Sequence, residues 1–316
     1  THTITWDANG GTFSDNKTEK TSTNVPDGAT IINYKPEDPA YNDGSREFIG
    51  WNTAKNGYGD ELRASDVIDG DSVTYYAQWR DVRYVRLNPN GGTLTGVDTI
   101  KRYPGEGDVT LPTTVTKPNY TFAGWFERNN NGELTGEEIK VIASNDMGSY
   151  DLYAKWTPVK YNVTWNANGG ALSGEGYTTG SVDYGTTIIA PNDPTKAADA
   201  QYTYTFDGWY TEAEDGDKVT SFGTVTGNVT YYAHWTQTVN KYTVSWNANG
   251  GNLSGDYTTG SVNYGTQIVA PTASKAADAQ YTYTFDGWYT AAEDGTKVET
   301  FGTVTGNVTY YAHWTS

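Results

Sequence analysis

The chain has 316 residues, a formal net charge of −17 at pH 7 and no cysteine. The charge argues against a nucleic-acid or anionic-membrane partner, because neutralisation of phosphates by Lys and Arg dominates such binding. Without cysteine there are no disulfides, thiol nucleophiles or thiolate metal sites. No apolar stretch reaches the roughly 20 residues of a membrane-spanning helix. No signal peptide precedes Thr1, so the sequence is expected to be a fragment of a longer protein.

The first expected element is an alternating strand that ends in a turn. This opening phrase lies at Ile4 to Gly11 and returns at Tyr84 to Gly92, Tyr161 to Gly170 and Tyr242 to Gly251. Apolar and polar residues alternate before Asn-Gly-Gly, which predicts a half-buried strand closed by a turn. Leu87 replaces the tryptophan of the other copies. Because an apolar side chain is kept there, we expect a core position.

The middle phrase of each copy is Phe-x-Gly-Trp. Its tryptophans are separated by 74, 84 and 79 residues and are Trp51, Trp125, Trp209 and Trp288. Regular spacing of this kind is typical of a tandem array of one small module. The glycine before each tryptophan permits a β-bulge, which we expect to turn the indole towards the core.

The closing phrase has the pattern Tyr-Ala-x-Trp and is predicted to be the last strand of each copy. It lies at Val73 to Trp79, Tyr150 to Trp156, Val229 to Trp235 and Val308 to Trp314. Successive residues of a strand point to opposite faces, so neighbouring tyrosines must point to opposite sides of the sheet.

These three phrases divide the chain into four modules of about 80 residues. We predict module one at residues 1–80, module two at 81–157, module three at 158–237 and module four at 238–316. Modules of this size bury modest cores, so aromatic residues should carry much of their stability. The joints are four to six residues long, which leaves little slack. We therefore expect an extended, monomeric rod, roughly 100–160 Å long.

Module three gives the most detailed prediction. A second strand is expected at 181–190 with a kink at 184–186, a loop at 191–194 and one turn of helix at 196–200. A third strand should begin near Tyr202. No long amphipathic helix is apparent anywhere, so the fold class is predicted to be mainly β with little helix.

The order of the three phrases resembles the Listeria–Bacteroides repeat, also called the internalin-type B-repeat. The resemblance covers all four modules and is strongest in the third and fourth. It implies a small α+β, β-grasp-like module, related in shape to ubiquitin-like and mucin-binding domains. The family occurs in bacterial surface proteins as a spacer or receptor-binding unit, and the resemblance implies no catalytic residues.

Candidate catalytic residues are few. His234 and His313 occupy a slot that Gln78 and Lys155 fill in the other modules, which favours a solvated strand face over a catalytic or metal role. The carboxylates are scattered over loops, and no pair is singled out for acid–base work. Serine elbows and phosphate-loop patterns are absent. We therefore predict that the chain is not an enzyme.

One segment of module two matches the spacing of a twelve-residue calcium loop. Residues 127–138 have oxygen-bearing side chains at alternating early positions, glycine sixth and glutamate twelfth. Its candidate ligands are Glu127, Asn129, Asn131, Glu133 and Glu138. Glutamate stands first where aspartate is usual, and the other modules lack the pattern. The alternative interpretation is a polar hairpin tip, and no other cofactor is expected.

Two functions remain open. The first is a non-catalytic stalk in an extracellular bacterial surface protein, favoured because a stalk needs repeated geometry more than individual pockets. The second is a glycan- or host-receptor-binding module that uses the outward tyrosines Tyr232 and Tyr311. A binder should expose a contiguous aromatic patch, whereas the exposed surface of a stalk should be mixed and polar.

Overall fold

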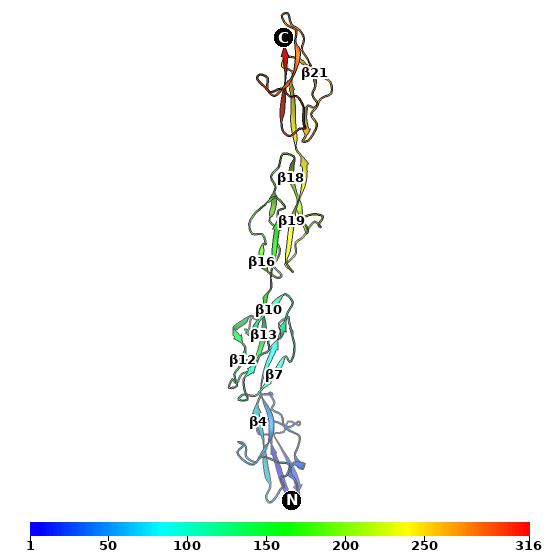
Figure 1. Cartoon of the computed structure of the whole chain (residues 1–316). Helices are drawn as coiled ribbons and strands as arrows, with labels where there is room; N and C mark the ends of the chain where they lie inside the picture. The colour runs from blue at the N-terminus through cyan, green and yellow to red at the C-terminus, as the bar shows by residue number, and fades with distance from the viewer. The chain divides into compact units, whose positions relative to one another are not determined.

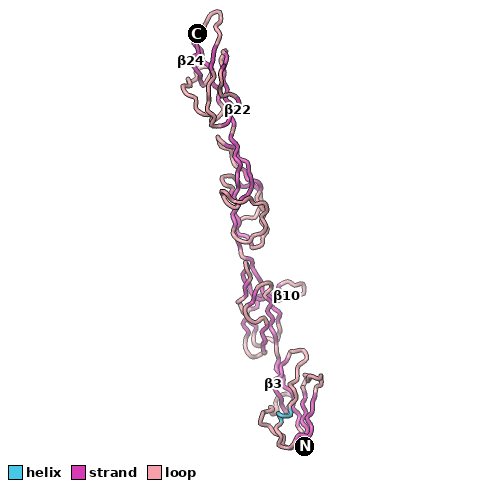
Figure 2. Tube along the Cα trace, turned by 90° about the vertical axis from the view of Figure 1, so that its right-hand side faces the viewer, coloured by secondary structure: helices cyan, strands magenta, loops and turns pink.

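The computed structural model describes residues 1–316 and consists of strands and loops. One short 3-10 turn, η1 (Ile31–Tyr34), is the single helical element, and Figure 2 shows it in cyan. The prediction of a mainly β chain is therefore confirmed. None of the structure has the length and apolarity of a membrane-crossing helix.

The chain divides into two compact units, unit 1 (Thr1–Val159) and unit 2 (Lys160–Ser316). Unit 1 contains two separate hydrophobic clusters and unit 2 contains two more. Every residue of a cluster comes from one predicted module. Each repeat thus buries its own core.

In unit 1, the first repeat forms a four-stranded sheet of order β2-β1-β4-β3 and the second a five-stranded sheet of order β11-β10-β13-β5-β7 (Figure 1). Two short ladders, β6-β9 and β8-β12, complete the second repeat. The strands are β1 (His2–Asp7), β2 (Glu19–Val25), β3 (Arg46–Asn52), β4 (Val73–Asp81), β5 (Arg83–Asn88), β6 (Thr93–Leu94), β7 (Thr99–Arg102), β8 (Val109–Thr110), β9 (Val115–Thr116), β10 (Tyr120–Arg128), β11 (Leu134–Ile139), β12 (Val141–Ile142) and β13 (Tyr150–Pro158).

In unit 2, both repeats have the same plan, with sheets of order β16-β14-β19-β18 and β22-β20-β25-β24 and short ladders β15-β17 and β21-β23. The strands are β14 (Lys160–Asn166), β15 (Ala171–Ser173), β16 (Gly180–Asp183), β17 (Asn192–Thr195), β18 (Tyr202–Tyr210), β19 (Val229–Val239), β20 (Lys241–Asn247), β21 (Asn252–Ser254), β22 (Gly260–Asn263), β23 (Thr272–Ser274), β24 (Thr284–Tyr289) and β25 (Val308–Thr315).

The opening and closing phrases of each repeat are neighbouring, parallel strands. In module three, Trp165 on β14 is paired with Tyr231 on β19, and their rings stack 4.7 Å apart. Trp209 meets the same indole edge-on at 4.8 Å. Module two pairs Leu87 with Leu152 at the corresponding position, and both are buried. The prediction that Leu87 occupies a core position is confirmed.

A β-bulge in the middle phrase turns the tryptophan inward. The ladder between β18 and β19 shifts register between Phe206 and Gly208, where φ is +154°. Residues three apart on a regular strand face opposite sides, but here the rings of Phe206 and Trp209 lie on the same side, 5.4 Å apart. Trp209 is consequently buried, as the sequence predicts.

The Asn-Gly-Gly turn is held against the closing tryptophan. Trp235 Nε1 donates to the carbonyl oxygen of Ala167 at 3.1 Å. A Cβ added at Gly170 would lie 2.4 Å from Cζ2 of this indole and 2.7 Å from the Thr195 carbonyl oxygen. The second glycine is therefore needed because the ring and the backbone approach too closely for a side chain. The equivalent glycines Gly11, Gly92 and Gly251 have the same contact with their tryptophans.

Three expectations for module three were wrong. The second strand ends at Asp183, and beyond the turn only Thr187 forms a bridge, to Thr224. The expected loop at 191–194 contains most of β17, which pairs with β15. No helical turn forms at 196–200, because the Asp199 carboxylate accepts the amides of Gln201 and Tyr202 and fixes a turn instead.

Candidate binding surfaces

Tyr232 and Tyr311, the predicted binding residues, lie on the face of each sheet that points away from the core. Tyr232 is paired across the sheet with Tyr210, and Tyr311 with Tyr289. Both are half-buried, whereas the preceding Tyr231 is packed in the core. The adjacent tyrosines therefore point to opposite faces, as their strand periodicity predicts.

His234 is half-buried on this outer face, where it packs against a ring. Its imidazole stacks on the Tyr210 ring at 3.7 Å with an interplanar angle of 6°. Its Nε2 lies 2.9 Å from the carbonyl oxygen of Glu212. The Tyr210 hydroxyl donates to Asp207, and this bond lowers the pKa of Asp207 and raises the pKa of Tyr210. The position faces solvent in part, as the sequence predicts, and the ring stack is an addition to that prediction.

The residue after Gly-Trp and the residue before the closing tryptophan are in contact in modules two, three and four. Module four repeats the ring stack with Tyr289 and His313, 3.7 Å apart. Module two instead places Lys155 Nζ 4.8 Å from the centroid of Phe126. Sequence reasoning missed this because the bulge shifts the register between the two positions. The sequence did contain a signal of this contact. Where module three has Tyr210 and His234, module two has Phe126 and Lys155, so the two positions change together.

Exposed aromatic rings are dispersed. Of the large hydrophobic side chains that are exposed, the aromatic ones are Tyr58 in module one and Tyr281 in module four. The remaining exposed apolar side chains are aliphatic and occur in all four modules. The contiguous exposed aromatic patch that a sugar-binding surface would offer is thus not formed by exposed side chains.

The predicted calcium segment forms the hairpin between β10 and β11. Glu127 lies on β10 and Glu138 on β11, and Asn129, Asn131 and Glu133 lie in and beside the connecting turn. Asn129 Oδ1 accepts the amides of Asn131 at 3.0 Å and Glu133 at 2.9 Å. The calcium assignment stays a prediction, because these bonds describe a polar hairpin tip that a cation would have to reorganise.

No group of three or more Asp, Glu or His side chains has the arrangement of a metal site. Glu138 forms an ion pair with Lys140 at 3.2 Å, and Asn129 Nδ2 donates to Glu133 Oε2 at 3.0 Å. Of the five candidate ligands, Asn129 and Glu133 are therefore hydrogen-bonded to each other, and Glu138 is paired with a lysine.

A charged cluster joins the two repeats of unit 1. Glu47 accepts from Arg80 at 2.9 Å, from Lys101 at 2.8 Å and from the Tyr103 hydroxyl at 2.7 Å. Arg80 also lies over the Tyr103 ring at 3.5 Å and forms an ion pair with Glu106 at 2.8 Å. These hydrogen bonds lower the pKa of Glu47 to about 2, and the bonds from Lys101 to Glu47 and Tyr103 raise the pKa of Lys101 to about 12.

A neutral network joins the two repeats of unit 2. The Asn240 amide donates to the Gln201 carbonyl at 2.8 Å, and its Nδ2 donates to the Asp199 carbonyl at 2.7 Å. Its Oδ1 accepts from Thr203 Oγ1 at 2.7 Å, and its carbonyl accepts the amide of Tyr264 at 2.8 Å. One asparagine therefore links strands of both repeats.

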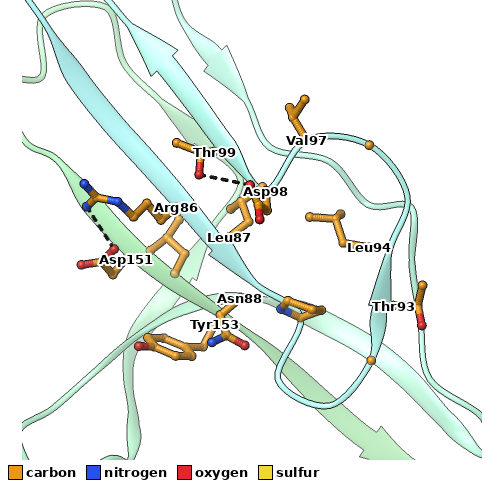
Figure 3. Close-up of a pocket in the computed structure, with 14 residues that line it drawn as sticks. Arg86, Leu87, Asn88, Thr93, Leu94, Val97, Asp98, Thr99, Asp151 and Tyr153 are labelled. Carbon is orange, nitrogen blue, oxygen red and sulfur yellow. Dashed lines mark hydrogen bonds and ion pairs between the residues drawn. The ribbon is translucent and has the colours of Figure 1, made fainter.

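Module two also contains an open groove of about 890 Å³ (Figure 3). It lies between β5, β13 and the segment that leads from β6 to β7. Leu87 and Leu152 belong to the core beneath it, and Leu94 and Val97 stand on the opposite side. Arg86 and Asp151 form an ion pair of 3.4 Å at one end.

The profile of the Listeria-Bacteroides repeat domain matches this chain at residues 2–78, 84–155, 161–234 and 242–313. Four tandem repeats therefore cover nearly the whole chain. Each matched range ends at or close to the tryptophan of a closing phrase, so the profile and the buried clusters divide the sequence in the same places.

Three curated proteins are similar in sequence. A protein of Evansella cellulosilytica named "Putative Gly-rich membrane protein" is 31% identical over 299 residues, which is 92% of this chain and 30% of that protein. A "Putative membrane protein" of the same organism is 31% identical over 249 residues, 77% of this chain and 33% of that protein. Internalin H of Listeria monocytogenes is 33% identical over 132 residues, 41% of this chain and 21% of that protein.

The chain thus spans about a third or less of the length of these relatives. What the three share with it is the repeated region and not a complete protein. With matches to all four repeats and a buried core in each, the chain belongs to the Listeria–Bacteroides repeat domain family.

Proposed function

We propose that these four repeats are a non-catalytic stalk in an extracellular surface protein of a bacterium. The observation that carries the proposal is the repetition itself: one order of four central strands, one tryptophan-capped turn and one bulge occur four times, and module two adds the edge strand β11. Two relatives are named as membrane proteins and a third as an internalin, which supports a place at the cell surface.

The surface and the joints support the same role. Exposed aromatic rings are dispersed, as a stalk requires and a sugar-binding face does not. Within each unit, side chains bond across the joint and resist independent motion of the two repeats. We also infer a β-grasp-like relationship, supported by the parallel pairing of first and last strands in every sheet.

Small-angle scattering of the full chain tests the stalk. We expect a monomer with a maximum dimension of roughly 100–160 Å, the length of four compact modules placed end to end. A profile as compact as a single globule would overturn the proposal. Glycine-rich insertion at a joint is the control, since it should broaden the distance distribution without unfolding any repeat.

The second candidate is binding of a glycan or host receptor by the outer faces of modules three and four. It is favoured by the Tyr210–His234 and Tyr289–His313 stacks, which hold rings beside Tyr232 and Tyr311. Rigid rings with polar edges are suited to stacking on sugars.

A glycan and mucin array separates the two candidates. If the outer faces bind, saturable binding should be lost on Tyr232→Ala with Tyr311→Ala and retained after replacement of the exposed Tyr58 and Tyr281. Performing the array with calcium and with chelator tests the hairpin of module two in the same experiment. Absence of binding, together with an elongated scattering profile, leaves the stalk.

A further inference from the structure

The groove of module two is located where module three buries aromatic rings of its own. Val85 and Val163 are equivalent residues of the opening phrase, and their partners across the sheet are Ile100 and Gly180. Counting three residues back from each partner makes Val97 of the groove equivalent to Tyr177.

Three aromatic residues of module three become aliphatic in module two. Trp165 corresponds to Leu87, Tyr231 to Leu152 and Tyr177 to Val97, and all three aliphatic residues line the groove. In module three the Trp165 indole donates to the Thr178 carbonyl at 2.7 Å, and Tyr177 packs against the same cluster. These smaller side chains contribute to the open space, although Leu87 and Leu152 themselves stay buried at its base.

The walls of the groove are partly apolar and partly polar, and their negative charge is not balanced. Val97 is 68% exposed, and Leu94 projects into the same space in Figure 3. Asp98 accepts a hydrogen bond from Thr99 Oγ1 at 3.2 Å but belongs to none of the ion pairs of the protein. Because Arg86 is already paired with Asp151, the Asp98 carboxylate is left for a cation.

We propose that this groove binds an aromatic ring with a neighbouring positive charge, presented by a partner polypeptide as Trp or Tyr beside Lys or Arg. The ring would occupy the space that aromatic residues fill in module three, and the cation would lie against Asp98. This inference depends on the groove alone and is independent of the stalk proposal.

Titration of the full chain with tryptamine, followed by amide chemical shifts in NMR, tests the proposal. We expect saturable shifts at Gly96, Val97, Asp98 and Thr99, and weaker binding of indole-3-propionate, which has the same ring and the opposite charge. A Trp-Lys dipeptide blocked at both ends distinguishes the two sources of the ligand: tighter binding than tryptamine supports a polypeptide. Weaker binding of the dipeptide than of tryptamine would indicate that the ligand is a free aromatic amine, and would overturn the assignment to a partner polypeptide.

Variants give the decisive result. Leu87→Trp restores the ring of the other modules and should weaken tryptamine binding by about tenfold or more, because the site is then filled. Val97→Tyr should do the same and disturbs folding little, since Val97 is exposed. Asp98→Asn should remove the preference for tryptamine over indole-3-propionate. Its matched control is Glu175→Gln, an exposed carboxylate in the corresponding loop of module three.

Two outcomes overturn the proposal. The first is an absence of saturable shifts in the native chain. The second is unchanged tryptamine binding in a folded Leu87→Trp or Val97→Tyr protein. If Leu87→Trp does not fold, Val97→Tyr alone decides. Scattering by the same samples reports on the stalk separately, so the failure of either proposal can be recognised without the other.

Discussion

The two joints inside the units use different chemistry for the same task. In unit 1, Glu47 gathers Arg80 and Lys101 into a charged cluster, whereas in unit 2 Asn240 connects two repeats through neutral groups. Exposed ion pairs are weak and screened by salt, while amide hydrogen bonds depend little on salt or pH. The comparison teaches that neighbouring repeats can be joined either by ion pairs, which salt screens, or by neutral hydrogen bonds, which salt affects little.

The largest effect is expected for Arg102→Met, which removes the support of the charged joint. Arg102 is buried and its guanidinium holds Ala143 and Asp146, while the Met147 carbonyl beside them accepts from Arg83 at 2.6 Å. Loss of a buried cation from its partners should lower the free energy of unfolding of module two by about 3 kcal/mol.

Calorimetry of the full chain checks this, because one transition should move to lower temperature while those of unit 2 stay. The solvent-exposed Arg86, which is paired with Asp151, provides the control through Arg86→Met. Equal destabilisation by both replacements would show that burial of Arg102 does not matter.

The next largest effect is expected for Asn240→Ala in the neutral joint. The side chain forms hydrogen bonds with the Asp199 carbonyl and with Thr203, and losing both should cost about 1–2 kcal/mol. Hydrogen exchange at the Asn240 amide, bonded to Gln201, should become faster. Val82, whose amide donates to Ser45 in the other joint, is the internal control. An equal change at Val82 would mean global rather than local opening.

A smaller effect is expected when pH is varied across the charged joint. Because hydrogen bonds lower the pKa of Glu47 from 4.5 to about 2, its contribution is complete above about pH 4.5 and is lost as pH falls towards 2. Because the pKa of Lys101 is raised from 10.5 to about 12, its contribution is complete below pH 10.5 and is lost as pH rises through 12.

Hydrogen exchange at the Val82 amide, measured as a function of pH and corrected for intrinsic exchange rates, should become faster in acid and again in alkali. We call these two changes the acid limb and the alkaline limb. Glu47→Gln should flatten the acid limb. Near the other joint, the Tyr204 hydroxyl and two backbone amides lower the pKa of Asp199, so acid also affects that region. If the Glu47→Gln protein still shows the acid limb, another carboxylate must cause it.

The smallest effect, and the cleanest separation of the joints, is expected from salt. Raising ionic strength from about 0.01 M to 1 M shortens the screening length from about 30 Å to 3 Å. Exchange at Val82 should become faster, and exchange at Asn240 should change little. Equal responses at the two amides would remove the distinction between a charged and a neutral joint.

Local patterns in the sequence determined much of the fold. Alternation, Asn-Gly-Gly turns and Gly-Trp phrases placed the principal strands, the inward tryptophans and the bulge, because each depends on the conformational preferences of a few neighbouring residues. The repetition of the phrases identified four modules and the family. Periodicity also assigned Tyr232 to the outer face, because this follows from the pleat of a single strand.

Only the tertiary structure decided features that depend on register and on distant contacts. The Tyr210–His234 stack follows from a bulge that shifts two strands, and β17 forms because β15 offers a partner. The joints and the groove join residues that are distant in the sequence, such as Glu47 with Lys101 and Leu87 with Leu152. No local preference encodes such pairs, because their energy exists only once the chain has brought them into contact.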